Sequence, residues 1–266
     1  MDKPKMKQMK KTIFLPALLV AGALLTGCSQ DEASPREGTL KVDLRAETGF
    51  KTRSIDQTAY EDITNYTVKL VETQTGKVVN EATYGNWDLA YQVESNKQYT
   101  LSASYGEEVP ASYDKLLCYG EETFTVMPGT TKTVAFAATP RAAKVSVNYS
   151  DDFTTYCNDC EVSVKTQYMT APEVINMEKA GRELYLKAGE NETVTLGFKV
   201  IGKDGNEVAD KSATKTVTVS PRTWLKVTVK PNVTQIEGGK FGINVIVDDG
   251  VTEENIDFNV PNDVFN

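Results

Sequence analysis

The chain of 266 residues contains no histidine. This absence excludes Ser-His-Asp and Cys-His nucleophilic sites, histidine-containing zinc sites and the usual proton shuttle near neutral pH. Enzymes that work without histidine are chiefly glycosidases, which use two carboxylates at a set separation. Because the chain has 37 acidic residues, a carboxylate hydrolase stays open as an alternative. No catalytic motif stands out in the sequence, and we expect no catalytic site, no metal site and no cofactor.

The sequence also lacks an apolar run long enough to cross a bilayer near its start. The run Ile13–Leu25, broken only by Pro16, is short of the roughly 20 residues that a transmembrane helix needs. A basic segment with five lysines between positions 3 and 11 precedes it. This order is typical of a secretory signal peptide, so we expect the segment to be removed.

The apolar run ends in Leu25-Thr26-Gly27-Cys28, which we interpret as a lipobox. The small Gly27 lets the signal peptidase approach the backbone, and the Cys28 thiol takes a diacylglycerol through a thioether. We therefore expect a signal peptide at 1–27 and a lipidated tether at 28–37. Acyl chains contribute about 0.8 kcal/mol per buried methylene, so they would hold the protein to a membrane. The alternative is that Cys28 merely ends an ordinary signal sequence.

An acidic pair, Asp31 and Glu32, follows the cysteine closely. The segment Ser29-Gln30-Asp31-Glu32 resembles the surface-export signal of Bacteroidota-type lipoproteins. It implies a lipid-anchored protein of the cell outer membrane that faces outside. The alternative is a solvated acidic tether.

The part of the chain that follows the signal is acidic. Removal of residues 1–27, with five lysines and one aspartate, leaves 24 basic and 36 acidic residues, a net charge of −12. Nucleic acids require a basic surface, and so does electrostatic binding to anionic lipid. We therefore expect no nucleic-acid partner, and attachment to the membrane only through the lipid on Cys28.

Most of the remaining sequence alternates apolar and polar residues, as half-buried strands do. The alternation covers 40–44, 66–70, 87–93, 99–105, 124–126, 134–138, 145–149, 162–164, 184–186, 194–200, 217–219, 225–229 and 243–247. Only Ala171–Arg182 lacks it, and this stretch could form a loop or one short helix. Short strands with turn signals at this spacing predict an all-β fold of antiparallel, Ig-like β-sandwiches.

An internal repeat divides this all-β region. Phe124-x-Val126-x-Pro128 followed by Val134-x-Phe136 recurs as Val217-x-Val219-x-Pro221 followed by Val227-x-Val229, with an offset of 93. This suggests that one sandwich topology occurs twice. We predict tandem domains at 38–140 and 141–266.

Three cysteines remain after lipidation: Cys118, Cys157 and Cys160. Outside the inner membrane a disulfide between Cys157 and Cys160 is a candidate, and the odd count leaves one thiol free. Their spacing also occurs in redox motifs, but such a motif needs a helix N-terminus, and here a strand pattern follows. Plain thiols are the other reading.

Four short motifs carry a resemblance to known proteins. They are Gly38-Thr39-Leu40-Lys41-Val42, Thr75-Gly76-Lys77-Val78, Tyr119-Gly120 leading to Phe124-x-Val126, and Ala143-Lys144-Val145-Ser146-Val147. From about Gly38 to its end, the chain resembles a Bacteroidota-type uncharacterised surface lipoprotein family and is more distantly similar to the fimbrillin-like superfamily. The resemblance implies two transthyretin-like β-sandwiches in tandem and polymerisation by donation of a strand into a partner's groove.

The resemblance also implies a processing site. Fimbrillin-like stalk subunits are trimmed at an arginine between the first strand and the rest, and Arg53 lies at that place. The alternative is an ordinary loop arginine. The segments Ile243–Val247 and Ile256–Val260 could be a donated strand pair, or they could complete the chain's own sheet.

These observations leave three functions open. The first is a structural or adhesive surface lipoprotein without catalytic activity, either an accessory or anchor of a fimbria or a free-standing protein. The second is a glycan-binding lipoprotein of a polysaccharide-uptake system, which would present Trp87, Trp224 or some of the 12 tyrosines as a solvent-facing platform. The third is the carboxylate hydrolase.

Overall fold

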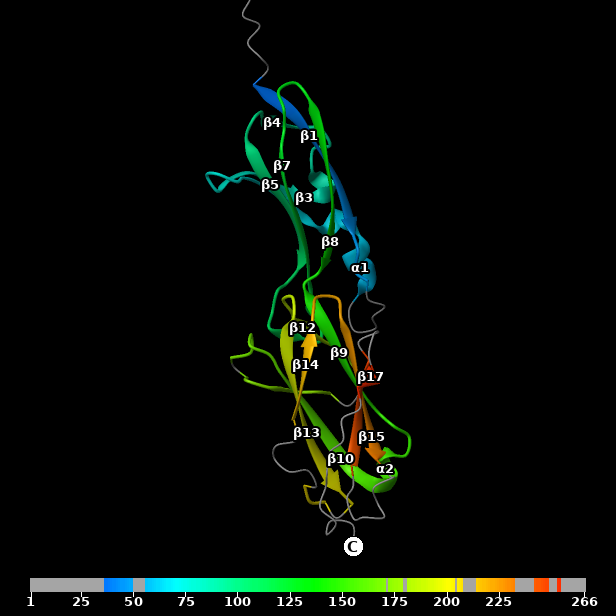
Figure 1. The fold of residues 1–266 in the computed structure, drawn as a ribbon. Helices are drawn as coiled ribbons and strands as arrows, with labels where there is room; N and C mark the ends of the chain where they lie inside the picture. Colours follow the sequence, from blue (N-terminus) through cyan, green and yellow to red (C-terminus); the bar gives the residue numbers. More distant parts are fainter. Residues whose placement is uncertain are drawn as a thin grey trace, which may run out of the picture. The chain divides into compact units, whose positions relative to one another are not determined.

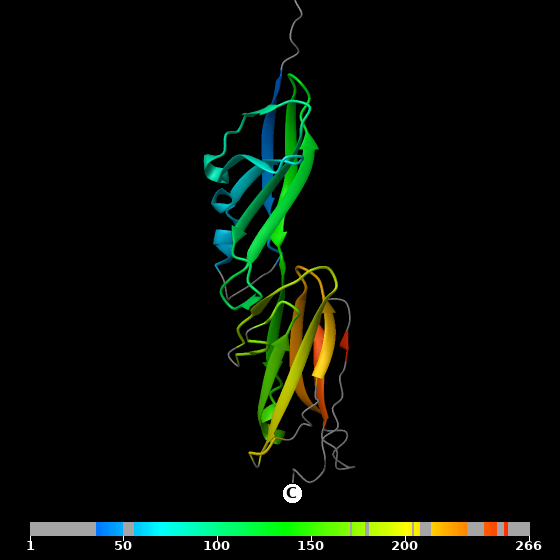
Figure 2. The same cartoon turned by 90° about the vertical axis from the view of Figure 1, so that its left-hand side faces the viewer.

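The structure is a computed structural model that describes residues 36–49, 56–170, 172–178, 181–203, 205–207, 214–232, 242–248 and 253–254. Figure 1 shows its ribbon, and Figure 2 shows the same ribbon turned by 90°. The described elements are almost all strands, so the predicted all-β sandwich class is confirmed.

The first half of the chain forms one seven-stranded sheet in the order β3-β2-β5-β7-β8-β1-β4. Its elements are β1 (Glu37–Ala46), α1 (Gln57–Glu61), η1 (Ile63–Asn65), β2 (Thr67–Glu72), β3 (Lys77–Thr83), η2 (Tyr84–Asn86), β4 (Tyr91–Glu94), β5 (Gln98–Gly106), β7 (Leu117–Thr125) and β8 (Thr131–Pro140). β7 and β8 pair only at Cys118↔Pro140 and Tyr119↔Thr139. The sheet is therefore folded at this corner into two layers, and the apolar alternation of its strands fills one core between them.

The second half forms two sheets around a second core. A four-stranded sheet has the order β11-β10-β13-β14, and a six-stranded sheet has the order β17-β16-β15-β9-β12-β6. The elements are β6 (Ala111–Ser112), β9 (Ala142–Tyr149), α2 (Phe153–Tyr156), β10 (Cys157–Lys165), β11 (Ile175–Asn176), β12 (Leu184–Lys187), β13 (Glu192–Gly202), β14 (Thr214–Val219), β15 (Trp224–Asn232), β16 (Gly242–Asp248) and β17 (Glu253–Glu254). β6 comes from the first half of the sequence and extends this sheet beside β12.

The two halves have the same strand order. β1, β2, β3, β4, β5, β7 and β8 correspond in chain order and in sheet position to β9, β10, β11, β12, β13, β14 and β15. β8 begins at Thr131 and β15 begins at Trp224, which is the offset of 93 seen in the sequence. The repeat therefore extends to seven strands of each half, whereas β6, β16 and β17 have no counterpart in the first sheet. The domain boundary near Pro140-Arg141 stays a prediction.

One pair of strands in each half departs from the antiparallel pattern that the sequence predicts. β1 runs parallel to β8, and β9 runs parallel to β15. Alternation of apolar residues reports which face of a strand is buried, but it does not report the direction of the neighbouring strand. Since these pairs join the first and last strands of each repeat, no short hairpin forces them to be antiparallel.

The structure also decides two local expectations. The stretch Ala171–Arg182 contains the short strand β11, which pairs with β10, so the expected alternative of a helix is wrong for its described residues. Ile243–Val247 lies in β16 and pairs with β15 of the same chain, so this segment completes its own sheet. Ile256–Val260 lies outside the described residues.

Candidate interaction surfaces

Most of the predicted functional residues precede the part of the chain that the structure describes. Leu25, Thr26, Gly27, Cys28, Asp31 and Glu32 lie before residue 36, and Arg53 falls in the gap between 49 and 56. The lipidation, export and processing sites therefore stay predictions. Within the described ranges, no helix has the length and apolar character to span a membrane.

The two tryptophans do not form a solvent-facing platform. Trp87 has only 5% of its surface exposed, and its ring lies 5.6 Å from that of Tyr91 at an angle of 41°. In the structure as described, its indole N–H has no hydrogen-bond partner. Trp224 donates from its indole nitrogen to Ser146 Oγ at 3.1 Å. Trp87 therefore serves packing, whereas the Trp224 ring is only half-buried.

Trp224 belongs to a buried charged cluster in the six-stranded sheet. The Lys144 ammonium lies 3.5 Å from the Trp224 ring centre and 3.1 Å from Glu183 Oε1. Lys144 is fully buried, and this burial lowers its pKa below the usual value, against the opposing effect of Glu183. The sequence gives no signal for this pair, because Lys144 stands between Ala143 and Val145 as an outward-facing strand residue would.

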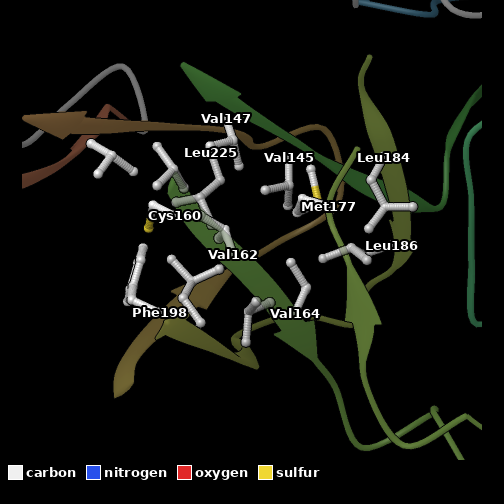
Figure 3. Packing of buried hydrophobic residues seen from close by; sticks show 14 of the residues in the cluster. Val145, Val147, Cys160, Val162, Val164, Met177, Leu184, Leu186, Phe198 and Leu225 are labelled. Atoms are coloured by element: carbon white, nitrogen blue, oxygen red, sulfur yellow. The ribbon is translucent and has the colours of Figure 1, made fainter. Parts of the chain in front are cut away.

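The three described cysteines, Cys118, Cys157 and Cys160, are all buried. A strand would place Cys157 and Cys160 on opposite faces, but a bulge between Cys157 and Asp159 shifts the register, so both lie in the second core. Figure 3 shows Cys160 in this core with Phe198 and Leu225. Burial raises the pKa of Cys157 and of Cys118 to about 11, which makes both thiols poor nucleophiles. No disulfide joins Cys157 to Cys160 here, and the pairing stays a prediction.

A groove lies between β7 and β8 in the first half. Its volume is about 340 Å³, and it is lined by Glu122–Thr125 of β7 and Lys132–Ala135 of β8. The two strands meet at the corner, where Gly120 permits a close approach to the Ala137 carbonyl, and they separate beyond it. In the described structure, neither strand has a pairing partner on the side that faces the groove. The sequence analysis missed this groove, because alternation predicts strands and not the gaps between them.

The acidic residues gather into no metal-binding arrangement where the structure describes them. No cluster of three or more Asp, Glu or Cys side chains suited to a metal occurs in the described ranges. Among the described residues, ten salt bridges join carboxylates to lysines or arginines, and most of these pairs are exposed. Exposed ion pairs of this kind contribute little to stability.

Residues 36–262 match the family called Domain of unknown function (DUF4493). The chain belongs to this family. The match covers nearly all of the two repeats, and it confirms the resemblance to an uncharacterised family. No curated protein matches the DUF4493 chain.

Several solved structures are similar to the DUF4493 chain. A candidate polysaccharide-binding protein (DUF1812) from Bacteroides thetaiotaomicron has 11% identity and a TM-score of 0.42, over 82% of this chain and 98% of that one. A candidate adhesin from Bacteroides ovatus has 10% identity and a TM-score of 0.41, over 83% and 95%. The fimbrial anchor protein Mfa2 from Porphyromonas gingivalis has 10% identity and a TM-score of 0.39, over 84% and 99%. These similarities are low, and none of them decides what this DUF4493 chain does.

Proposed function

We propose that this chain is a lipid-anchored surface protein of the outer membrane with a structural or adhesive role, either as an accessory or anchor of a fimbria or as a free-standing protein. The observation that carries the proposal is the order of a basic segment, a short apolar run and Leu25-Thr26-Gly27-Cys28. An all-β body of two repeats follows this signal, and its acidic surface would not bind a membrane by itself.

In this proposal, only the lipid contacts the membrane, so the protein surface is available to bind other proteins. Acyl chains on Cys28 would hold the chain to the membrane, while residues 29–36 separate it from β1. Asp31 and Glu32 are proposed to direct the chain to the outer face. Buried thiols of raised pKa and the lack of histidine support a role without catalysis.

The anchoring part is tested by metabolic labelling with an alkyne analogue of palmitate in a Bacteroidota host. The native chain should take up the label, Cys28→Ala should not, and Cys118→Ala is the matched control because its thiol is buried. Mass spectrometry should find the chain starting at Cys28. An intact residue 1–27 segment, or label on Cys28→Ala, would refute the proposal.

The orientation part is tested by shaving intact cells with a protease. We expect the native chain to be degraded, and the double variant Asp31→Asn/Glu32→Gln to be protected while it keeps its lipid. Equal degradation of both would show that the acidic pair is only a solvated tether.

The processing part concerns Arg53, which follows β1 in the sequence. We propose that a cut there separates β1 from the rest of the chain, as in fimbrillin-like stalk subunits. Nicking of the purified protein with an arginine-specific protease should then produce self-polymers, and Arg53→Ala should prevent them, while trypsin could still cut the variant at Lys51. A glycan array measures the alternative function, and saturable sugar binding without polymers would favour it.

A further inference from the structure

We propose that the two repeats form one cooperative unit, because each repeat supplies part of the hydrophobic core of the other. A substitution in one repeat should therefore destabilise both, although the sequence predicts two tandem domains. The proposal rests on the contacts between the repeats and holds whether or not Cys28 is lipidated. Its failure would leave the proposed function unaffected.

The second repeat contributes Tyr185 to the first core. This residue lies in β12 between Leu184 and Leu186, whose side chains both belong to the second core. Because successive side chains of a strand point to opposite faces, Tyr185 points away from that core. It has 1% of its surface exposed and packs with the residues of the first core. Ala142, at the start of β9, also belongs to the first core. β12 thus carries side chains of both cores on its two faces.

The first repeat in turn contributes a loop to the second core. This loop, residues 107–116 between β5 and β7, is called the strap. It contains β6, which pairs with two residues of β12 and so joins the six-stranded sheet of the second repeat. Ala111 and Tyr113 of the strap pack against the second core. The Tyr113 hydroxyl accepts a hydrogen bond from the backbone N–H of Glu178 at 2.9 Å. The exchange of side chains between the two cores is therefore reciprocal.

The contact between the repeats is closely packed. A cavity lined in part by Leu116 of the strap, Ala142 and Tyr185 has a volume of about 10 Å³, which is room for about one water molecule. β9 is buried on both faces from residue 142 to residue 147. Only Arg141 joins β8 to β9, so no flexible linker separates the repeats. Separation of the repeats would therefore expose parts of both cores to water, which is unfavourable.

Ion pairs also join the repeats, but they contribute little to the coupling. Lys187 Nζ lies 2.6 Å from Glu108 Oε2 in the strap, and Arg182 Nη2 lies 2.6 Å from Asp114 Oδ1. These four side chains are 32–73% exposed, and exposed pairs are weak and are screened by salt. The buried contacts should therefore dominate the coupling, so that about 1 M NaCl does not abolish it.

The two tryptophans allow each repeat to be followed separately in the full chain, purified in detergent. Trp87→Phe leaves Trp224 as the reporter of the second repeat, and Trp224→Phe leaves Trp87 as the reporter of the first. In each variant, urea unfolding followed by fluorescence should coincide with the loss of β-structure in circular dichroism, which reports on both repeats. Leu196→Ala, in the second core, should lower the midpoint that Trp87 reports by about 1 M urea.

A matched pair of tyrosine variants locates the coupling. Tyr185 and Tyr99 are both buried in the first core, with 1% and 2% of their surface exposed, but only Tyr185 comes from the second repeat. Tyr99→Ala should lower the midpoint and leave the two repeats unfolding together. Tyr185→Ala should separate their transitions by at least about 0.5 M urea, with the first repeat unfolding earlier. If Tyr185→Ala does not fold, Tyr185→Leu should show a smaller separation in the same direction.

Hydrogen exchange provides a second measurement that needs no substitution. Leu101 and Leu196 are fully buried, one in each core. In a single cooperative unit, their amides should exchange through the same global opening and with the same free energy.

Four results would overturn the proposal. They are separate transitions for the two tryptophans without any core substitution, a Leu196→Ala variant that leaves the Trp87 midpoint unchanged, equal effects of Tyr99→Ala and Tyr185→Ala, and different opening free energies for Leu101 and Leu196. Separation of the transitions by salt alone would assign the coupling to the ion pairs, and would refute the role of the exchanged core residues.

Discussion

Gly120 controls the corner at which β7 meets β8, and its substitution gives a defined prediction. A Cβ atom added there would lie 2.2 Å from the Ala137 carbonyl oxygen, 2.8 Å from its carbon and 3.1 Å from Ala138 Cα, whereas ordinary contacts begin at 3.4 Å. The atoms in the way are backbone atoms of the adjacent strand, so no side-chain rotation relieves the contact. Gly120→Ala must therefore move β8 away from β7 or distort one of the strands.

Overpacking of this kind costs about 1–3 kcal/mol. Alanine also has less conformational freedom than glycine in the unfolded chain, which stabilises the folded state by about 0.4–1 kcal/mol. We expect the free energy of unfolding to fall by about 1–2 kcal/mol, a decrease in Tm of roughly 2–8 °C for a chain of this size. The pairs Cys118↔Pro140 and Tyr119↔Thr139 should be the first to weaken, and hydrogen exchange of these amides should show it.

Gly197 provides the matched control. A Cβ atom there would lie 2.5 Å from Ser163 Oγ, with no other atom closer than 3.9 Å, and this hydroxyl can rotate away. Gly197→Ala should cost less than about 0.5 kcal/mol in urea unfolding, and the double variant with Ser163→Ala should be no less stable than Ser163→Ala alone. A Gly120→Ala protein as stable as the native one, or a Gly197→Ala protein that loses as much, would refute the reasoning.

Three further predictions concern buried polar groups. Glu183→Gln should lower the free energy of unfolding in urea titrations by about 3–5 kcal/mol, because the fully buried Lys144 loses the carboxylate 3.1 Å away. The double variant Glu183→Gln/Lys144→Met should regain most of this stability. Failure to regain it would contradict the pairing. Burial raises the pKa of the Cys118 thiol from 9.0 to about 11, so the thiol loses its proton at a lower pH in the unfolded state than in the folded state. The free energy of unfolding should therefore fall as the pH rises from about 9 to 11. Cys118→Ala should show a shallower fall, and an unchanged dependence on pH would disprove the linkage. Tyr66→Phe removes the buried hydrogen bond from Tyr66 Oη to the Tyr60 carbonyl at 2.7 Å and should cost about 1–3 kcal/mol in thermal unfolding, whereas a neutral effect would mean that water replaces it.

The fold class and most strand positions could be predicted from the sequence, because period-two alternation directly reflects burial on one face of a strand. Leu40, Val68, Leu101 and Val145 alternate with polar residues and are buried without exception. The repeat was also visible, since Pro128 and Pro221 mark equivalent turns at a fixed offset. These features are local or periodic, so they can be detected in a single sequence.

Features that depend on long-range pairing could not be predicted. Nothing in the Ala143-Lys144-Val145 segment indicates that Lys144 is buried against Glu183, 39 residues away. The direction of β1 relative to β8 is set by pairing between strands that are far apart in the chain. The groove exists because β7 and β8 separate beyond Gly120, and a sequence pattern contains no information about such a gap.

The parallel pairing of β1 with β8 has a mechanical consequence. The eight residue pairs from Thr39↔Thr131 to Ala46↔Ala138 run in one direction, and the chain enters β1 at one end of this ladder and leaves β8 at the other. Tension between the tether and the second repeat would therefore act along both strands in opposite directions, in shear. All the hydrogen bonds of the ladder would share that load at once instead of opening one after another. The first repeat should thus resist a force that pulls the start of β1 away from the end of β8.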